Sequence, residues 1–361
     1  MSSPPEPPLP LADPLDAGFD PHRLEQAATL LHTEVTAGRV HAASLLVARG
    51  GRVALHRGFG VAPDAVFLLA SISKPVNAVA LMLLVEQGRV ELDAPAARWL
   101  PELQGPERAR IRVRDLLTHT SGLPDMLPQN IALRRVHAPL SAFVQGVFTT
   151  PLLYPPGQGF AYQSMGTLLA GEIAQRVSGR PLGDFQREAV FEPLGMRGAS
   201  LGLGGRPLAD LVPCQTDGSA DAALFGANTP YWRDMGHPWG GMHACASDLA
   251  VLLQTFLDGG VWRGRRFLQA DTVRAMTRDQ NGAIGCPWGL GWGLADSPVW
   301  VYCGRRLSPR AFGHSGATGT VAWADPDSGV LAVVLTTRPT AEDDGALLHA
   351  VSERVADAVR G

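Results

Sequence analysis

Apolar residues at regular spacing predict a chain that begins with one helix and two strands. They recur at helical intervals from Pro21 to Ala37, after an Asp20-Pro21 pair that is typical of a helix start. Two strands are predicted next, from His41 to Ala48 and from Arg52 to Gly58, with Gly50-Gly51 as the hairpin turn. This antiparallel start differs from the strand–helix–strand unit of a parallel sheet.

The C-terminal third returns to a mixture of helices and strands. A helix is predicted from a cap at Ser247-Asp248 to Leu257. Strands are predicted from Thr318 to Ala324 and from Val330 to Thr337, followed by an amphipathic helix from Thr340 to Val359. Strands therefore lie toward both ends of the chain, which favours one antiparallel sheet covered by the terminal helices.

Helices and loops predominate between these regions, with few strand-like alternations from Pro124 to Arg233. We therefore predict an α+β fold, in which an antiparallel sheet flanked by the N- and C-terminal helices carries an inserted, mostly helical domain. The predicted boundaries are a loose, proline-rich N-terminus at 1–18, a sheet domain at 19–100 and 236–361, and a helical insert at 101–235.

Composition excludes several classes of protein. With 45% hydrophobic and 18% charged residues, the 361-residue chain is typical of a soluble enzyme. A net charge of -3 gives no basic surface for nucleic acid. Neither a secretory signal nor an apolar run of ~18 residues is found, so we expect a cytoplasmic protein without a membrane partner. The four widely spaced cysteines predict reduced thiols.

One lysine stands out among the basic residues. Of the 31 basic residues 30 are arginine, and the remaining one is Lys74. Arginine stays protonated in proteins, whereas a buried lysine can lose its proton. Ser71 lies three residues earlier, at the start of an apolar helix predicted from Ser71 to Gln87, so the hydroxyl and the amine lie on one helix face. Such a pair can act as an activated nucleophile and its base.

Other motifs fail on spacing or context. Lys74 follows a serine rather than a glycine, which excludes a Walker A loop. The glycines from Gly289 to Gly293 lack the dinucleotide-binding spacing, and Gly313 to Ala317 ends in alanine where a hydrolase nucleophile elbow needs glycine. His237 and His243 fit no standard metal motif, so neither a metal ion nor another cofactor is expected.

Four motifs together resemble those of a known family. The chain contains Ala70-Ser71-Ile72-Ser73-Lys74-Pro75, the segment from Leu116 to Pro124, Tyr154-Pro155-Pro156-Gly157 with Tyr162 after it, and Gly313-His314-Ser315-Gly316 with Thr318-Gly319 after it. In their order and spacing, the chain resembles the serine β-lactamase and penicillin-binding-protein superfamily, in its class C-like branch of family VIII carboxylesterases. The resemblance implies a split sheet domain with a helical insert, a β-lactamase/transpeptidase-like fold.

The same resemblance implies a role for each motif residue. Ser71 would be the nucleophile, Lys74 its base, and Tyr162 the relay of the proton to the leaving group. The backbone N–H groups of Ser71 and Ala317 would form the oxyanion hole. Further contacts with the substrate would come from Ser164, His314, Ser315 and Gly316.

Two of these positions depart from the family's pattern. Ser164 stands where the Tyr-x-Asn motif has asparagine, and His314 stands where the Lys-Thr-Gly motif has lysine. The second change removes a permanent positive charge that favours the carboxylate of β-lactam substrates, since histidine is mostly neutral near pH 7. The resemblance associates His-Ser-Gly with esterases. We therefore predict a serine hydrolase that acts as a carboxylesterase on small or acyl esters.

Alternatives stay open at this stage. The same acyl-enzyme could serve a β-lactamase, a D-Ala peptidase or an acyltransferase, and the two departures would also suit a binding protein without activity. His119 is interpreted as structural, because its neighbours are typical of a tight turn. Trp232, Trp288 and Trp292 suit an acyl pocket and core packing equally.

Overall fold

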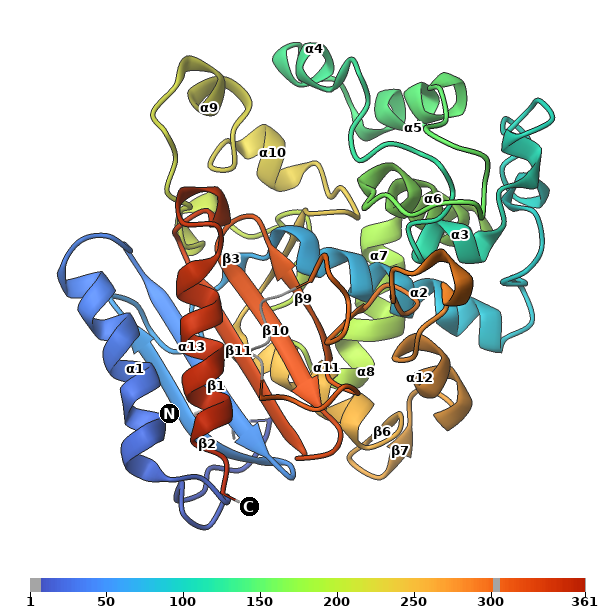
Figure 1. The fold of residues 1–361 in the computed structure, drawn as a ribbon. Helices are drawn as coiled ribbons and strands as arrows, with labels where there is room; N and C mark the ends of the chain where they lie inside the picture. The colour runs from blue at the N-terminus through green and yellow to red at the C-terminus, as the bar shows by residue number, and fades with distance from the viewer. Residues whose placement is uncertain (1–7, 301–305, 361) are drawn as a thin grey trace.

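The centre of the molecule is an antiparallel sheet. The computed structural model describes residues 8–300 and 306–360, and within them six strands pair in the order β2-β1-β11-β10-β9-β8 (Figure 1). The hairpin glycines Gly50 and Gly51 have φ angles of 55° and 77°, as a tight hairpin turn requires. The strands are β1 (Ala43–Arg49), β2 (Arg52–Phe59), β8 (Gly293–Leu294), β9 (Phe312–Gly316), β10 (Thr320–Asp325) and β11 (Val330–Thr336).

Helices cover both faces of this sheet, which explains why its central strands β1, β10 and β11 are mostly apolar and are buried along almost their whole length. In Figure 1, α1 (Pro21–Thr36) and α13 (Ala346–Asp357) lie side by side across one face. On the opposite face, α11 (Ala246–Leu257) packs against β1, β10 and β11. Successive residues of β1 point to alternate faces, so Leu45 packs in the core beneath the terminal helices and Leu46 in the core on the other side.

Helix α2 (Ser73–Glu86) is buried on almost every side, as its continuous apolar sequence predicts. A single 3₁₀ turn, η1 (Ala70–Ile72), precedes it. The helix predicted from Ser71 to Gln87 is therefore confirmed, apart from this tighter first turn. Helix α6 (Ser164–Ser178) packs against α2, and the side chain of Asn77 donates a hydrogen bond of 3.1 Å to a backbone carbonyl of α6.

A second, three-stranded sheet joins distant parts of the chain. Its order is β3-β5-β4, from Phe67–Leu68, Met242–Ala244 and Ser200–Leu201. The sequence pattern does not predict it, because strands of two or three residues are too short to show alternation. Strand β3 leads almost directly into η1, so this sheet determines where the turn that carries Ser71 begins.

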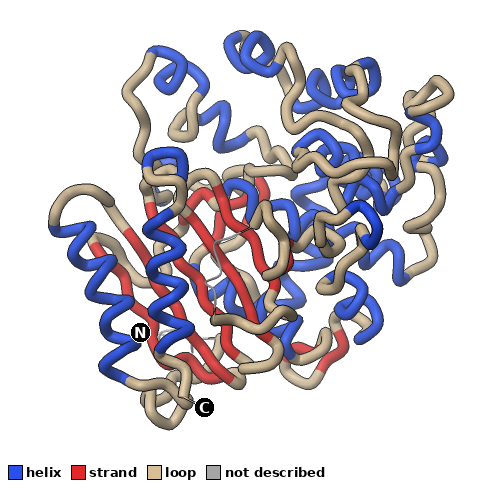
Figure 2. Tube along the Cα trace, viewed as in Figure 1, coloured by secondary structure: helices blue, strands red, loops and turns tan. Residues whose placement is uncertain are grey.

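The other described segments are mainly helices and loops, blue and tan in Figure 2, and the predicted α+β fold is confirmed. The domain boundaries stay a prediction. None of the helices in the described ranges combines the length and the apolar character that a bilayer crossing needs. The remaining elements are η2 (Ala96–Arg98), η3 (Arg108–Arg110), α3 (Val113–Leu117), α4 (Asn130–Arg135), α5 (Leu140–Thr149), α7 (Leu182–Gln186), the π-helix η4 (Arg187–Phe191), α8 (Glu192–Leu194), η5 (Leu208–Asp210), α9 (Ala220–Phe225), α10 (Pro230–Asp234), β6 (Val261–Trp262), β7 (Arg265–Arg266), α12 (Ala270–Met276), η6 (Gly282–Ile284) and η7 (Thr340–Glu342).

The N-terminal segment differs in part from the expectation that it is loose. Leu9 is buried, and Leu11 forms a parallel bridge with Val53 on β2. Burial of Leu9 removes apolar surface from water, which stabilises the attachment of this stretch to the sheet. Residues 1–7 lie outside the described residues.

The N-cap of α11 lies two residues before the position that we predicted for it. The helix is capped by Cys245, and Ser247 lies inside its first turn. The Asp248 carboxylate accepts hydrogen bonds from the backbone N–H of Cys245 at 3.2 Å and from its thiol at 3.1 Å. A carboxylate at the third helical position reaches back to the cap residue, so Asp248, one of the two residues predicted to cap the helix, completes the cap at Cys245.

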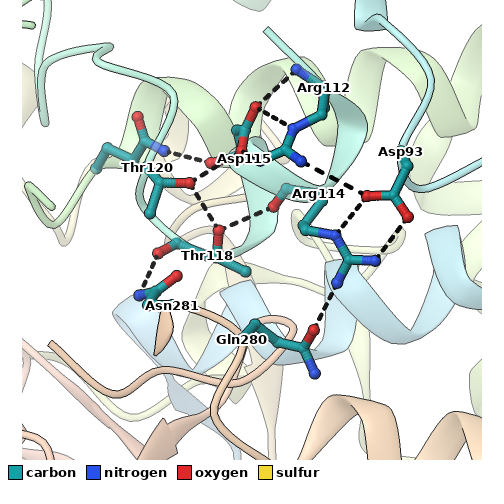
Figure 3. Close-up of polar contacts among 9 residues, drawn as sticks. Asp93, Arg112, Arg114, Asp115, Thr118, Thr120, Gln280 and Asn281 are labelled. Carbon is teal, nitrogen blue, oxygen red and sulfur yellow. Dashed lines mark hydrogen bonds and ion pairs between the residues drawn. The ribbon is translucent and has the colours of Figure 1, made fainter. Parts of the chain in front are cut away.

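A buried carboxylate organises the chain that follows α3. Asp115 is 1% exposed, and its oxygens accept hydrogen bonds from the Arg112 guanidinium at 2.8 Å and from the Thr120 hydroxyl at 3.1 Å (Figure 3). Figure 3 also shows that the neighbouring Arg114 pairs with a second carboxylate. These contacts hold segment 118–125, which enters the site described below.

Replacing Asp115 by alanine is expected to destabilise the fold by about 3 kcal/mol, because Arg112 and Thr120 lose their buried partner. This figure is at the low end for a buried pair, since Arg112 is 43% exposed. Thermal unfolding followed by circular dichroism should show a melting temperature several degrees below that of wild type.

Asp221→Ala is the matched control for this variant. The Asp221–Arg135 pair is 41% and 58% exposed, so its loss should cost less than about 1 kcal/mol. Equal shifts of the melting temperature in the two variants would contradict the role assigned to Asp115.

Candidate active site

Ser71 and Lys74 lie in direct contact, as their spacing predicts. The Lys74 Nζ donates hydrogen bonds to the Ser71 Oγ at 3.0 Å and to the backbone carbonyl oxygen of Trp239 at 3.2 Å. Lys74 is 3% exposed, whereas Ser71 is partly exposed. A hydroxyl that a substrate can reach therefore lies against an amine that water barely reaches, which suits a nucleophile and its base.

The turn that presents Ser71 is held by backbone contacts on both sides. Ala70 has a φ of 49°, which is uncommon for a residue other than glycine. The Ser73 hydroxyl donates to the Ala70 carbonyl at 2.6 Å and accepts from the Met242 N–H at 3.0 Å, while the Leu69 N–H donates to the Met242 carbonyl at 2.9 Å. These bonds tie the strained turn to β5, which stabilises it.

Burial controls the protonation of Lys74. Removal of the amine from water disfavours its charged form and lowers the pKa of Lys74 from 10.5 to about 7, while the negative charge of Asp125 acts in the opposite direction. A lysine with this pKa is partly deprotonated at neutral pH and can accept the proton of Ser71. Arginine would keep its proton at this position.

The ring of Tyr162 packs against the Lys74 amine. The Nζ of Lys74 lies 4.6 Å from the centre of the Tyr162 ring, which packs against His119 at a centroid distance of 4.7 Å and Trp288 at 6.0 Å. Burial raises the pKa of Tyr162 well above 10, and an interaction with the Ser71 side chain offsets only part of this effect. Tyr162 therefore stays protonated at neutral pH, which favours its hydroxyl over its phenolate as the form that relays a proton.

Gln163 holds Tyr162 in place, a role that the sequence analysis missed. Its buried side chain accepts a hydrogen bond from the Ser121 hydroxyl at 2.6 Å and donates one to the Asp115 carbonyl at 3.1 Å. Its backbone N–H donates to the Nδ1 of His119 at 3.1 Å. Burial keeps the pKa of His119 well below 6.5, so the ring is a neutral acceptor here. The sequence offered one signal for Gln163, its place next to Tyr162.

Strand β9 brings Ala317 close to the turn that carries Ser71. A Cβ atom on Gly316 would lie 2.1 Å from the carbonyl oxygen of Leu69, so only glycine permits this approach. The Thr320 hydroxyl donates to the same carbonyl at 2.9 Å. Among the described residues, the backbone N–H groups of Ser71 and Ala317 donate to no acceptor, so both are available to an oxyanion.

His314 supplies no permanent charge to the site. It is 2% exposed and packs beside Tyr162 and Trp288, at centroid distances of 6.0 and 5.8 Å. Burial lowers the pKa of His314 to about 3, and the positive charge of Lys74 acts in the same direction. Its Nδ1 donates to the carbonyl oxygen of Ser315 at 2.7 Å. The imidazole is therefore neutral near pH 7.

The hydroxyl of Ser164 contacts Asp125, a second residue that the sequence analysis missed. The Ser164 Oγ donates to the Asp125 Oδ1 at 2.7 Å, and the Ser164 N–H donates to the Asp125 carbonyl at 3.3 Å. Within the described residues, Ser164 makes no hydrogen bond to Lys74. The sequence signal for Asp125 was its place directly after the motif that ends at Pro124.

The three tryptophans considered as pocket residues have different surroundings. Trp292 is 1% exposed and packs in the core, and Trp288 is equally buried behind Tyr162. Trp232 is partly exposed, and its ring centre lies 4.1 Å from that of His237. Of the three tryptophans, Trp232 is therefore the one with an exposed part that could line an acyl pocket.

The remaining polar candidates are His237, His243 and the cysteines. Within residues 8–300 and 306–360, no three His, Cys, Asp or Glu side chains gather as possible ligands. His237 and His243 are both buried, and the Nδ1 of His243 contacts the carbonyl of Gly202 at 2.9 Å. Cys303 lies outside the described residues, and the free thiols are Cys214, Cys245 and Cys286.

Comparison with known proteins identifies the family and the fold. The family model described as Beta-lactamase matches residues 27–356, which is most of the chain. A "Putative D-alanyl-D-alanine carboxypeptidase" of Salmonella enteritidis PT4 is 25% identical to the chain, over 92% of this chain and 87% of its own length.

Two solved structures share the fold. A penicillin-binding-protein homologue from Caulobacter crescentus is 24% identical with a TM-score of 0.76, over 94% of this chain and 99% of its own. A family VIII carboxylesterase is 20% identical with a TM-score of 0.71, over 93% and 98% of the two chains. The match of the family model to nearly the whole chain shows that the protein belongs to the beta-lactamase family, within the superfamily of serine β-lactamases and penicillin-binding proteins.

Proposed function

We propose that this serine hydrolase is a carboxylesterase that acts on small or acyl esters through an acyl-enzyme at Ser71. The observation that carries the proposal is the 3.0 Å contact between the Ser71 Oγ and the buried amine of Lys74, whose pKa is lowered to about 7. Membership of the beta-lactamase family supports hydrolysis by a serine, and the charges around the pair support an ester as the substrate.

Acylation begins with transfer of a proton from Ser71 to the free amine of Lys74, while the Ser71 Oγ bonds to the ester carbonyl carbon. The carbonyl oxygen becomes an oxyanion that accepts hydrogen bonds from the N–H groups of Ser71 and Ala317. The intermediate then loses the alcohol as its C–O bond breaks. The leaving oxygen takes a proton from Tyr162, which regains one from the Lys74 ammonium.

Deacylation uses the same groups in the opposite direction. The amine of Lys74, neutral again, takes a proton from a water molecule whose oxygen attacks the acyl carbon. The bond to the Ser71 Oγ breaks, and that oxygen regains a proton from Lys74. The carboxylic acid product leaves, and the starting enzyme is restored.

The charges at the site favour an ester over a substrate that is held by its carboxylate. His314 occupies the position of the family's lysine and is neutral near pH 7. Burial, together with the nearby charge of Arg134, lowers the pKa of His237. However, the Arg134 guanidinium stacks 3.8 Å from the centre of the Trp232 ring and donates to the carbonyl of Phe225 at 3.0 Å. In the described part of the chain, the carboxylate of a β-lactam or a D-Ala peptide would thus meet no cation at the place of the family's lysine.

Ser71→Ala should lower kcat/KM for p-nitrophenyl butyrate by at least ~100-fold, because no nucleophile remains. A fluorophosphonate probe should label wild type and leave this variant unlabelled. Ser141→Ala, on the exposed surface of α5, is the matched control and should retain both activity and labelling. Undiminished turnover in Ser71→Ala would refute the proposal, and labelling of wild type without any turnover would favour a binding homologue.

Lys74→Arg should lower kcat/KM by at least ~100-fold, because the charge remains while the base is lost. In wild type, kcat/KM should rise with pH through about 7, since the amine accepts a proton only after it has lost its own. Stopped assays of the same ester across this range would measure both effects. A near-normal rate in Lys74→Arg, or a profile that is flat across neutral pH, would contradict Lys74 as the base.

A substrate panel separates the esterase from a β-lactamase and from the D-Ala peptidase that the Salmonella relative's name suggests. We expect kcat/KM for p-nitrophenyl butyrate to exceed that for a chromogenic cephalosporin or a D-Ala-D-Ala peptide by tenfold or more, which is about the effect of one charge-assisted hydrogen bond. His314→Lys should raise the cephalosporin-to-ester ratio. A higher kcat/KM for the cephalosporin or the peptide than for the ester in wild type would favour these alternatives. If an alcohol is added to the assay, formation of its ester would reveal acyltransfer.

A further inference from the structure

Asp125 carries a carboxylate that the proposed mechanism does not use. It ends segment 118–125, which the buried Asp115 holds, and it is exposed. Its Oδ1 accepts the Ser164 hydroxyl at 2.7 Å, and its backbone carbonyl accepts the Ser164 N–H at 3.3 Å. The first residue of α6 therefore fixes both the side chain and the backbone of Asp125.

The carboxylate of Asp125 forms no ion pair with another described residue. Within the described residues, no lysine, arginine or histidine nitrogen lies within 4.0 Å of it, and its Oδ2 receives no hydrogen bond. The exposed Asp221, by contrast, pairs with Arg135 at 2.9 Å. Ser164, the partner of Asp125, is the first residue of α6 and follows Tyr162 by two residues, which places the Asp125 carboxylate on the Tyr162 side of the site. The charge of this carboxylate favours the ammonium form of Lys74.

The other titratable groups around the nucleophile leave this negative charge uncompensated. His119 and His314 are buried, and burial keeps the pKa of each below 6.5. Lys74 is the one cation in contact with Ser71 and Tyr162 in the described part of the chain, and its hydrogen bonds go to Ser71 and Trp239. A positively charged group of a substrate would therefore meet a carboxylate with a free oxygen.

We propose that Asp125 binds a cationic amine of the substrate, so that the preferred substrates are small esters with an ammonium group in their acyl or alcohol part. This inference rests on the proposed esterase function and names its substrate class. Ser164 positions the carboxylate, which gives its hydroxyl a function different from that of the asparagine amide at this place in the family's motif.

Matched pairs of esters test the proposal, because each pair differs in charge and little in shape. Alanine methyl ester and methyl isobutyrate form the pair for the acyl side, and acetylcholine and 3,3-dimethylbutyl acetate form the pair for the alcohol side. Acid release in a pH-stat gives kcat/KM for each ester. Wild type should prefer the cationic member of at least one pair by tenfold or more.

Asp125→Asn should reduce this preference to less than about threefold. Asparagine keeps an oxygen that accepts the Ser164 hydroxyl and has nearly the same shape, while a neutral amide nitrogen replaces the second, charged oxygen. The ratio within a pair is the decisive quantity, since loss of Asp125 also changes the protonation of Lys74, which affects both members alike. Asp271→Asn, an 87% exposed residue paired with Arg274 on α12, is the matched control and should keep the wild-type preference.

Salt supplies a readout that a purely structural role of Asp125 would not change. Raising the ionic strength from ~0.01 M to ~1 M shortens the Debye length from about 30 Å to about 3 Å, so the preference of wild type for the cationic ester should weaken. The rate on the neutral ester should change much less.

The possible results separate this inference from the function on which it rests. Equal kcat/KM values within both pairs in wild type, or a preference that survives in Asp125→Asn, would overturn the inference while Ser71-dependent hydrolysis of the neutral esters still supports an esterase. If wild type hydrolyses none of the four esters and no p-nitrophenyl ester, the esterase proposal fails and the inference fails with it.

Discussion

The burial of one amine beside one hydroxyl is the constraint on which the site depends. An ammonium group in apolar surroundings costs free energy, and Lys74 reduces that cost by releasing its proton. The apolar helix α2 creates those surroundings, while Ser71 and the Trp239 carbonyl accept the amine's hydrogen bonds. The core that stabilises the protein therefore also produces the base, and a more polar α2 would weaken both.

The remaining parts of the site come from segments far apart in the sequence, so backbone contacts determine their geometry. The Ser73 hydroxyl joins η1 to β5, the absence of a side chain at Gly316 lets β9 approach Leu69, and Gln163 joins α6 to segment 118–125. None of these contacts involves a group that reacts. Each fixes one wall around Ser71, and because interiors are closely packed, a shift at any one of them would displace a donor or an acceptor.

The sequence predicted those features that depend on local pattern. The first helix, the hairpin, α2 and the contact between Ser71 and Lys74 follow from periodicity, turn residues and spacing along one helix face. The roles expected for Tyr162 and Ala317 came from the resemblance, since no local pattern connects positions so far apart.

Features that depend on tertiary contacts could not be predicted in this way. The three-stranded sheet has strands of two or three residues, too short for a period, and Gln163 and Asp125 gain their importance from partners that folding brings together. The predicted cap at Ser247-Asp248 placed the start of α11 too late for a local reason, because Asp248 caps Cys245 from within the first turn rather than from before the helix.

The exchange of lysine for histidine at position 314 changes the electrostatics of Lys74 as well as those of a substrate. A second ammonium at that place would repel the first and lower its pKa further. Because His314 is neutral, two opposing influences remain on the pKa of Lys74. Burial favours the free amine, and the Asp125 carboxylate favours the ammonium. Their balance leaves the amine near the midpoint of its titration at neutral pH, where a group can both accept and return a proton, as the two halves of an acyl-enzyme reaction require. The single negative charge of Asp125 would thus have two effects: it would raise the pKa of Lys74, and it would favour cationic substrates.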